Sequence, residues 1–356
     1  MSELAAILRA YRPDASLALE ITGVSLRVHT NAPAVRERLG RYFAAYAVED
    51  PGPGASDVFL FSGTPVYDPS RMSDVPRRSR ADTVKEAFYD APDARIVLKR
   101  RTGVVIYVAE PFHYIVGDLE ANFNQAVNMI MMVFAKTLLR RGYIMLHASA
   151  ILGETGGIAF ASPSGSGKST LALMLLEQRH HLVSNDRLLL RPMPGGVEMI
   201  GVPKQPRVNP GTLLRVPSLT RLLPADEVTR YRPLPPEQLW VLEHKHDVDV
   251  DAIYGPGTVQ LRGRLRAVFL LRWSINSRGW SVHTVPPGER VAALSRVVKG
   301  LGVYDVAPPS AEARDRTLAA ACETVSVYEV SGRADLDRLA ALVLEHPMLS
   351  PAAGAP

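Results

Sequence analysis

Hydrophobic and polar residues alternate in short runs through the first third of the chain. This period of two predicts half-buried strands at 17–21, 24–29, 58–61, 95–99 and 104–108. Arg101-Thr102-Gly103 lies between the last two runs and predicts a hairpin turn. Residues 35–47 have the apolar spacing of one amphipathic helix. We therefore expect a small α+β domain over residues 1–115.

From residue 116 the pattern changes to helical stretches that alternate with apolar strands. Asp118 as N-cap and Gly142 as a stop predict a long helix over 119–141. Residues 192–260 are rich in proline and glycine, which predicts loops with short helices. Further strands are predicted at 144–152, 157–161, 182–183, 188–190 and 266–272, and helices at 168–178, 289–299 and 335–345. This order predicts an α/β domain over 116–350, followed by a frayed tail at 351–356.

Composition excludes several protein classes. The 356 residues are 47% hydrophobic and 22% charged, proportions of a globular chain and not of a disordered or collagen-like one. The single cysteine, Cys322, excludes an internal disulfide and a cysteine-based zinc cage. A net charge of +5 without a block of lysines or arginines gives little reason to expect nucleic-acid binding.

The chain has no segment with the pattern of a membrane span or an export signal. Its best candidate, Met129–Phe134, is far shorter than the roughly 18 apolar residues that a span needs. The first residues lack the basic start and the apolar stretch of a signal peptide. We expect a cytoplasmic protein with no membrane and no nucleic-acid partner, and a homo-oligomer is compatible with the sequence.

The clearest chemical motif is Ser162-Pro-Ser-Gly-Ser-Gly-Lys-Ser-Thr170. It matches the phosphate loop G-x-x-x-x-G-K-[ST] at every position except the first, where Ser162 replaces glycine. An apolar strand precedes it and an Ala/Leu-rich helix follows it, a frame that a flexible Gly/Ser linker would lack. Backbone N–H groups and the helix N-terminus would then point at a polyphosphate. The predicted nucleotide-binding residues are Ser162, Pro163, Ser164, Gly165, Ser166, Gly167, Lys168, Ser169 and Thr170.

Individual residues of the motif have predicted roles. Lys168 would reach the β- and γ-phosphates, and the Ser169 hydroxyl would bind Mg²⁺. Gly165 and Gly167 permit tight curvature of the main chain. The predicted ligands are therefore ATP and Mg²⁺.

Two residues outside the motif are candidates for catalysis. Asp186 follows an apolar step, where a carboxylate beside a phosphate loop can hold Mg²⁺ or accept a proton. The alternative is a surface aspartate paired with Arg187. His147 lies in an apolar strand expected beside the loop-bearing strand, and its alternative is a hydrogen-bonded core histidine.

Three segments together resemble the C-terminal catalytic domain of HPr kinase/phosphorylase. They are His147-Ala-Ser149, the loop 162–170, and Arg179-His-His-Leu-Val-Ser-Asn-Asp186. They are more distantly similar to ATP-dependent phosphoenolpyruvate carboxykinase. The chain most resembles the bacterial HprK-related kinase B proteins, through 201–212 and 239–257 as well, and the resemblance covers roughly 95–300. It implies an α/β P-loop kinase core of the HPr kinase/PEP carboxykinase type behind an N-terminal α+β domain.

This resemblance implies an ATP- and Mg²⁺-dependent phosphotransferase. The position of Asp186 acts near the attacking hydroxyl in HPr kinase, and those of His147 and Asp186 bind a metal in the carboxykinase, so both roles stay open. Asn185 stands where HPr kinase has a second aspartate. No counterpart of the phosphorylase signature is present, so reversal by phosphorolysis is not expected. The first 115 residues do not match the N-terminal domain of HPr kinase, so HPr is not the expected substrate.

Weaker candidates lie in the proline-rich region. Lys204 and Arg207 are expected to face the phosphate site, where two cations would clamp a phosphate or an anionic acceptor, or else lie in solvent. The carboxylates of 243–251 would bind a second Mg²⁺ or form one solvated face. His244 and His246 are candidate ligands of a transition metal, but nothing else in the sequence supports such a site. Trp240 and Tyr254 are interpreted equally as packing residues and as ligand contacts.

We therefore predict a kinase that moves the ATP γ-phosphoryl group to an unidentified acceptor, a hydroxyl of a protein serine or a small molecule. The predicted catalytic residues are Asp186, Lys168, His147 and Arg207, with Ser169 and Asp186 at the metal. The alternatives are a nucleotide-regulated binding or scaffold protein without turnover and, third, a carboxykinase-like enzyme.

Overall fold

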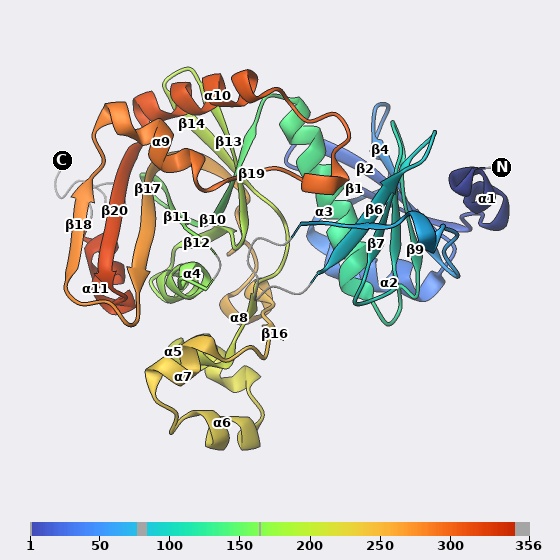
Figure 1. The fold of residues 1–356 in the computed structure, drawn as a ribbon. Helices are drawn as coiled ribbons and strands as arrows, with labels where there is room; N and C mark the ends of the chain where they lie inside the picture. The colour runs from blue at the N-terminus through green and yellow to red at the C-terminus, as the bar shows by residue number, and fades with distance from the viewer. Residues whose placement is uncertain (1, 77–83, 164, 346–356) are drawn as a thin grey trace. The chain divides into compact units, whose positions relative to one another are not determined.

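A computed structural model describes residues 2–76, 84–163 and 165–345 of the chain. These residues form two compact units. The first comprises Met1–Arg140 with Gly300–Pro308, and the second Arg141–Lys299 with Pro309–Pro356. Figure 1 draws both, and each is described by itself. The predicted tail at 351–356 lies outside the described residues.

The first unit is larger than the predicted domain 1–115. Helix α3 (Phe123–Arg140) packs on β2, β4 and β9, the strands of the first unit. Most of its residues are buried, so it belongs to that core and not to the second domain. The chain also returns at 302–304, where η5 (Gly302–Tyr304) packs on β7. The packing therefore places the boundary between the units after α3, whereas the sequence pattern placed it before this helix.

The first unit is a nine-stranded mixed sheet with helices. The strand order is β3-β1-β2-β4-β9-β8-β7-β6-β5. Its strands are β1 (Ala15–Ile21), β2 (Val24–Thr30), β3 (Ala47–Val48), β4 (Ser56–Ser62), β5 (Ser73–Asp74), β6 (Glu86–Asp90), β7 (Arg95–Lys99), β8 (Val105–Val108) and β9 (His113–Gly117). The helices before α3 are α1 (Glu3–Ala10) and α2 (Pro33–Tyr42). The predicted hairpin is confirmed, because β7 and β8 pair antiparallel.

The second unit is also a mixed α/β structure around a nine-stranded sheet. Its strands are β10 (Ile144–Gly153), β11 (Gly156–Ala161), β12 (His181–Ser184), β13 (Arg187–Met193), β14 (Gly196–Gly201), β17 (Arg262–Ser274), β18 (Trp280–Thr284), β19 (Val298–Lys299) and β20 (Ser326–Arg333). The pairings β10–β11, β11–β17, β17–β14, β14–β13 and β13–β10 close into a ring. This ring contains β11, the strand that precedes the glycine-rich motif, whereas β12, the first strand after it, pairs with β10 outside the ring.

Helices and a small lobe complete the second unit. The helices are α4 (Lys168–Leu176), α5 (Pro210–Arg215), α6 (Ala225–Tyr231), α7 (Pro236–Val241), α8 (Val250–Tyr254), α9 (Arg290–Ser295), α10 (Ala311–Thr324) and α11 (Leu336–Leu344). Strands β15 (Arg207–Val208) and β16 (His246–Asp247) form a separate pair. In Figure 1, the yellow helices α5, α6 and α7 gather at one end of this unit.

Three predicted elements differ from the structure. The helix predicted over 119–141 starts at Phe123, after a turn in which the Asp118 carboxylate accepts from Ala121 N. The region predicted as loops over 192–260 contains the buried strand β14, which pairs with β13. The helix predicted over 289–299 ends at Ser295, and the β-branched residues after it lead into β19.

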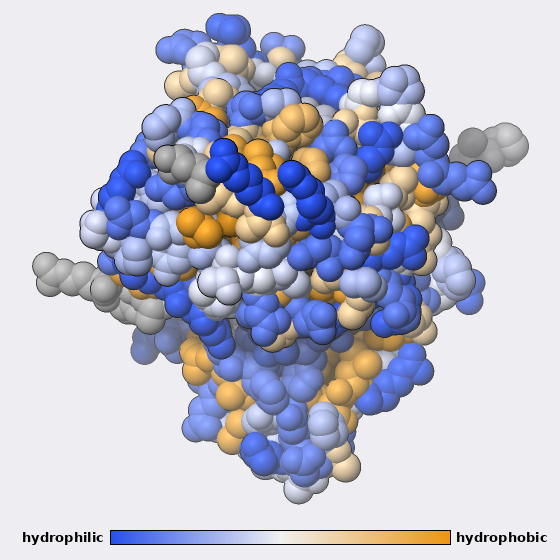
Figure 2. All heavy atoms as spheres, turned by 90° about the vertical axis from the view of Figure 1, so that its right-hand side faces the viewer, coloured by the Kyte–Doolittle hydropathy of each residue, from blue (hydrophilic) through white to orange (hydrophobic). Residues whose placement is uncertain are grey.

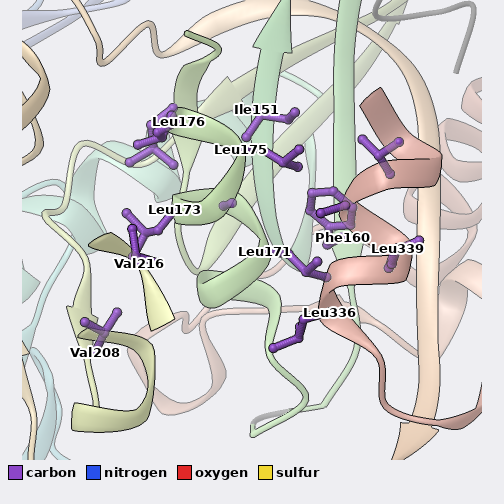
Figure 3. Packing of buried hydrophobic residues seen from close by; sticks show 14 of the residues in the cluster. Ile151, Phe160, Leu171, Leu173, Leu175, Leu176, Val208, Val216, Leu336 and Leu339 are labelled. Atoms are coloured by element: carbon purple, nitrogen blue, oxygen red, sulfur yellow. The ribbon is translucent and has the colours of Figure 1, made fainter. Parts of the chain in front are cut away.

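Helix α4 is packed on all sides in the core of the second unit. Figure 3 shows Leu171 and Leu175 of α4 near Phe160 and Ile151 of the sheet, with α11 beside the same helix. The residue pattern of α4 is apolar around most of its circumference, as expected for a helix enclosed by neighbours. This packing holds the first turn of α4, and with it Lys168, at a defined place above the sheet.

The described residues contain no helix long and apolar enough to cross a membrane. Figure 2 shows one face of the molecule, on which hydrophilic residues cover most of the surface and hydrophobic ones form small patches. Exposed large hydrophobic residues in the described ranges include Leu8, Val48, Val66 and Phe112. Single exposed residues of this kind are normal for a folded domain.

Gly201 is expected to be required for the fold of the second unit. A Cβ there would lie 1.6 Å from the Val183 carbonyl oxygen, so Gly201→Ala forces β12 away from β14. We expect a loss of about 1–3 kcal/mol or more in unfolding free energy, as for overpacked cores, measured by denaturant unfolding. Gly288→Ala is the matched control, because its Cβ has no neighbour within 4 Å. Equal stability of the two variants would contradict this packing.

Candidate functional site

The glycine-rich motif connects a buried strand to a buried helix. Strand β11 ends at Ala161, and α4 begins at Lys168. Gly165 and Gly167 have φ of 83° and 86°, a left-handed conformation that favours glycine. A Cβ on Gly167 would also lie 2.9 Å from Leu336 Cδ2. The motif thus forms a strand–loop–helix turn, while Ser164 lies outside the described residues.

Lys168 is folded back onto its own loop. Its Nζ donates to the carbonyl oxygens of Pro163 at 2.8 Å and Ser162 at 3.1 Å. Its side chain is buried, and this burial lowers the pKa of Lys168 to about 8, although Asp186 opposes the shift. Lys299 repels the same ammonium and lowers the pKa further. A buried cation of this kind would gain from an anionic ligand.

The other motif residues have distinct surroundings. Ser162, which replaces the first glycine, is buried, and its hydroxyl contacts both Pro163 O and the Ser166 hydroxyl. The Ser166 carbonyl accepts from Trp273 Nε1 at 2.9 Å, so β17 supports the loop. The Thr170 hydroxyl pairs with that of Thr212 at 2.7 Å. Serine at the first position therefore fits by bonding within the loop.

A short turn at 184–187 carries the candidate aspartate and is attached to β10. Ala148 N donates to Asp186 O at 3.1 Å, and Ser149 Oγ donates to Asn185 O at 3.0 Å. His147 Nε2 donates to the Asp186 carboxylate across a distance of 3.1 Å. The His-x-Ser segment and the turn are thus joined by three hydrogen bonds, which orient Asp186.

Asp186 stays ionised because cations surround it. Burial alone would raise the pKa of its carboxyl, but the hydrogen bond from His147 and the charges of Lys299 and Arg187 lower it well below its usual value. Arg187 Nε lies 3.6 Å from Asp186 Oδ2, so this ion pair, the alternative raised by the sequence, is present too. The Asp186 side chain is about half exposed, at 53%, and remains accessible to a ligand.

His147 is a neutral imidazole at neutral pH. Burial lowers the pKa of His147, Asp186 opposes this, and Lys168 and Lys299 reinforce it. A neutral ring that donates through Nε2 orients a carboxylate without adding a full positive charge. His147 therefore contacts Asp186 from the strand beside the loop-bearing strand, since β10 and β11 pair antiparallel, with Ala148 opposite Ala161.

Two further lysines join this cluster. Lys204, named by the sequence, has a lowered pKa because of burial, with Asp186 opposing and Arg187 and Arg207 reinforcing the shift. Lys299 did not emerge from the sequence, because its segment was assigned to a helix. In β19 it pairs opposite Met145 of β10, close enough for its charge to act on Asp186, Lys168 and His147. The β-branched pair Val297-Val298 before Lys299 favours a strand, and this pattern could have identified the segment.

These residues converge where β10 changes its neighbours. Strand β13 pairs with residues 144–147 and β12 with 150–152, so the turn with Asp186 lies at that change. Strand β19 pairs with Met145 and Leu146, whereas β11 pairs from Ala148 onward. The loop leaves β11 at this same level. The side chains meet because the two edges of one strand change partners near His147.

A cavity of about 490 Å³ adjoins the loop within the second unit. It is lined by backbone and side chains from Gly165 to Thr170 and by the apolar residues Leu239, Trp240 and Leu336. Four cations, Arg207, Arg215, Lys245 and Arg333, also line it. A cavity with an apolar wall and cations next to a helix N-terminus suits a ligand with an aromatic group and phosphates.

Residues named from the sequence have different places around the cavity. Arg207 lines it but forms an ion pair with Asp247, 2.7 Å apart. Trp240 lines it, whereas Tyr254 lies against α4 and donates to Glu177 at 2.9 Å. Both aromatic residues pack against the core, and of the two only Trp240 lines the cavity.

The carboxylates of 243–251 do not form one cluster. The Asp249 side chain caps α8 by accepting from Ala252 N, and Asp251 accepts from Val259 N. Asp247 pairs with Arg207, so each of the three has its own structural partner. Their positions therefore do not support the second Mg²⁺ site that the sequence suggested.

The residues present fit a polyphosphate and its metal ion. Gly165 has no atom within 4 Å of an added Cβ, and the loop amides and Lys168 offer donors for phosphate oxygens. Ser169 lines the cavity, and Asp186 offers a carboxylate held ionised, both hard oxygen donors suited to Mg²⁺.

Comparison with known proteins finds a distant likeness among solved structures. No family model matches the chain, and no curated protein is similar to it in sequence. Among solved structures, the Hpr(Ser) kinase/phosphatase from Coxiella burnetii matches with 12% identity and a TM-score of 0.29. The match covers 57% of this chain and 96% of that one. At this distance, the similarity decides neither activity nor family.

Lys168 is expected to lose its proton at an unusually low pH. A ¹³C NMR titration of the lysine Cε signals in the ligand-free protein should contain one signal that titrates near pH 8. That signal should be missing from the spectrum of Lys168→Met, which assigns it. Below pH 8 the ammonium is charged, and above it the neutral amine loses its attraction for phosphate. A spectrum in which every lysine signal titrates above pH 10 would contradict the buried position of Lys168.

Proposed function

We propose that the chain is an ATP- and Mg²⁺-dependent phosphotransferase with an HPr-kinase-like P-loop core. One observation carries this proposal: the buried Lys168 at the start of α4, with Asp186 acting on its charge and itself oriented by His147. A glycine-rich loop and a helix N-terminus supply phosphate donors, and the carboxylate lies next to them. Such a combination suits transfer of a phosphoryl group better than binding of a neutral ligand.

The proposed reaction transfers the γ-phosphoryl group of ATP to an acceptor hydroxyl. An acceptor hydroxyl oxygen bonds to the γ-phosphorus, and the bond from this phosphorus to the β–γ bridging oxygen breaks. ADP leaves, and the hydroxyl proton passes to Asp186 or to water. When bound, Mg²⁺ supplies charge neutralisation on the phosphates.

Each residue has a proposed role in this reaction. The loop amides and Lys168 hold the polyphosphate, and Lys168 exchanges its bonds to Ser162 and Pro163 carbonyls for phosphate oxygens. Ser169 and Asp186 would hold Mg²⁺, and His147 orients the carboxylate. Lys204 and Lys299 add positive charge where negative charge develops in the transition state. Arg207 would contact ligand from the cavity wall.

The charge state of Asp186 favours one of its two open roles. A carboxyl whose pKa is far below its usual value is a weak base, but it remains an anionic oxygen ligand at neutral pH. We therefore propose that Asp186 serves first as a metal ligand.

A second candidate is a nucleotide-binding protein without turnover. Asn185 provides no second carboxylate: its backbone carbonyl accepts from Ser149, and its Oδ1 is buried with no hydrogen-bond partner among the described residues. Persistent ATP binding with no labelled acceptor in a cell extract would favour this candidate. We propose no carboxykinase-like reaction, since no described cluster adds a substrate-carboxylate site.

Loss of either central residue is expected to abolish transfer. Lys168→Ala and Asp186→Asn should each lower transfer from γ-labelled ATP by about 10²–10³-fold, because each removes charge at the reacting phosphate. The readout is labelled protein or small molecule after incubation with a cell extract. Lys85→Ala, which removes an exposed lysine of the first unit, is the control and should retain activity. Wild-type transfer by both site variants would overturn the proposal.

Asp186→Asn is also expected to raise the Mg²⁺ concentration for half-maximal activity at least tenfold, because a charged ligand becomes neutral. The measurement is a Mg²⁺ titration of residual transfer. Asp315→Asn, an exposed aspartate of α10, is the matched control and should leave the Mg²⁺ requirement unchanged. A lower rate with an unchanged Mg²⁺ requirement would instead assign Asp186 to proton transfer.

A further inference from the structure

A group of metal-ligating side chains lies in the lobe formed by α5, α6 and α7, and none of the three contacts Asp186 in a hydrogen bond or ion pair among the described residues. Glu227 of α6, His244 and His246 each offer one donor atom, and the three atoms lie within 4.8 Å of one another. Glu227 and His246 are mostly buried, with side chains 14% and 18% exposed. The histidines follow α7, so the donors come from two segments that the chain brings back together.

Distances between the donors suit a tetrahedral ion. His246 Nε2 lies 3.2 Å from Glu227 Oε2, and His244 Nδ1 lies 3.5 Å from Glu227 Oε1. Zinc bonds of about 2.0–2.1 Å in tetrahedral geometry place neighbouring ligand atoms roughly 3.3–3.4 Å apart. The separation to His246 is slightly shorter than this value and that to His244 slightly longer, and each is measured to a different oxygen of the Glu227 carboxylate. An ion would draw the two imidazoles together.

The hydrogen bonding of the group is incomplete without an ion. Glu227 Oε2 and His246 Nε2 are both buried and lie 3.2 Å apart, yet neither forms a hydrogen bond of good geometry within the ranges that the structure describes. His244 Nδ1 has a weak contact with the Tyr231 hydroxyl at 3.3 Å, which an ion would replace. Buried polar atoms without partners are costly, and a cation shared by them removes that cost.

From this geometry we infer that Glu227, His244 and His246 form a binding site for Zn²⁺. Two imidazole nitrogens and one carboxylate oxygen are a donor set that zinc takes, with water in the fourth position. The single cysteine of the chain, Cys322, lies in α10 and takes no part. A nitrogen- and oxygen-rich set of this size favours Zn²⁺ over Mg²⁺, which prefers oxygen ligands.

The ion would clamp the segment that covers the nucleotide cavity. Glu227 precedes α7 and the two histidines follow it, while α7 itself has no buried residue. Leu239 and Trp240 of this weakly packed helix line the cavity beside the loop. Binding of Zn²⁺ would close the chain from α6 to β16 into a loop and hold α7 in place.

Metal binding by the full-length protein tests the site without nucleotide. After treatment with a chelator, the wild type should bind one equivalent of Co²⁺ with the visible absorption of a tetrahedral complex, and Zn²⁺ should displace it. Glu227→Gln, His244→Gln and His246→Gln should each weaken binding at least tenfold. His283→Gln, at an exposed histidine of β18, is the matched control and should bind like wild type. No Co²⁺ binding, or wild-type affinity in all three variants, would overturn the inference.

Tryptic cleavage provides a second readout that does not depend on the variants' stability. Arg232 and Lys245 are exposed; Arg232 lies between Glu227 and the two histidines, and Lys245 lies between His244 and His246. Zn²⁺ should slow cleavage at these two residues at least fivefold in the wild type and in His283→Gln. In His246→Gln, Zn²⁺ should leave the cleavage rate unchanged. Equal cleavage of wild type with Zn²⁺ and with chelator would contradict the clamp, and neither result depends on phosphate transfer.

Discussion

The exchange of partners along both edges of β10 is the constraint on which the candidate site depends. One edge passes from β13 to β12 across the turn that carries Asp186, and the other from β19 to β11, where the loop departs. Because both edges of β10 change partners near His147, segments from four strands meet at this level. Backbone hydrogen bonds from Ala148 then fix the turn against the strand.

The charges around Asp186 are unequal in number, because one carboxylate lies among several cations. The carboxylate of Asp186 acts on the charges of Lys168 and Lys204 and is itself affected by Lys299 and Arg187. The pKa values of Lys168 and Lys204 are lowered by burial and by neighbouring cations, Lys299 for Lys168 and the two arginines Arg187 and Arg207 for Lys204. A partly buried cluster with an excess of positive charge is costly for the protein alone and becomes favourable with a polyanion. This cost is the physical link between the fold and the proposed phosphate chemistry.

The lobe with α6 and α7 has a different physical basis. Its helices are short and α7 buries none of its residues, so packing alone contributes little to its position. The proposed ion at Glu227, His244 and His246 would hold the two segments together by coordination bonds, where apolar contacts are few. Because Trp240 lies on the same segment, the proposed metal site and the cavity beside the loop are connected through the chain.

The sequence by itself determined the features that depend on residues close together along the chain. The strand, the turn of Gly165 and Gly167 and the buried helix at Lys168 follow from local pattern, and so do most strands of the first unit. Candidate residues Asp186 and His147 were also named, although the sequence left the contact between them open. Local preference acts over a few residues, which is why these predictions were accessible.

Tertiary structure alone decided which distant residues meet. Lys299 reaches Asp186 only through the pairing of β19 with β10, and Glu227 meets His246 only because the chain folds back after α7. Helix α3 joined the first unit because its buried face packs on that sheet, against the predicted boundary. These neighbours are set by strand pairing and burial between segments far apart in sequence, and no local pattern carries that information.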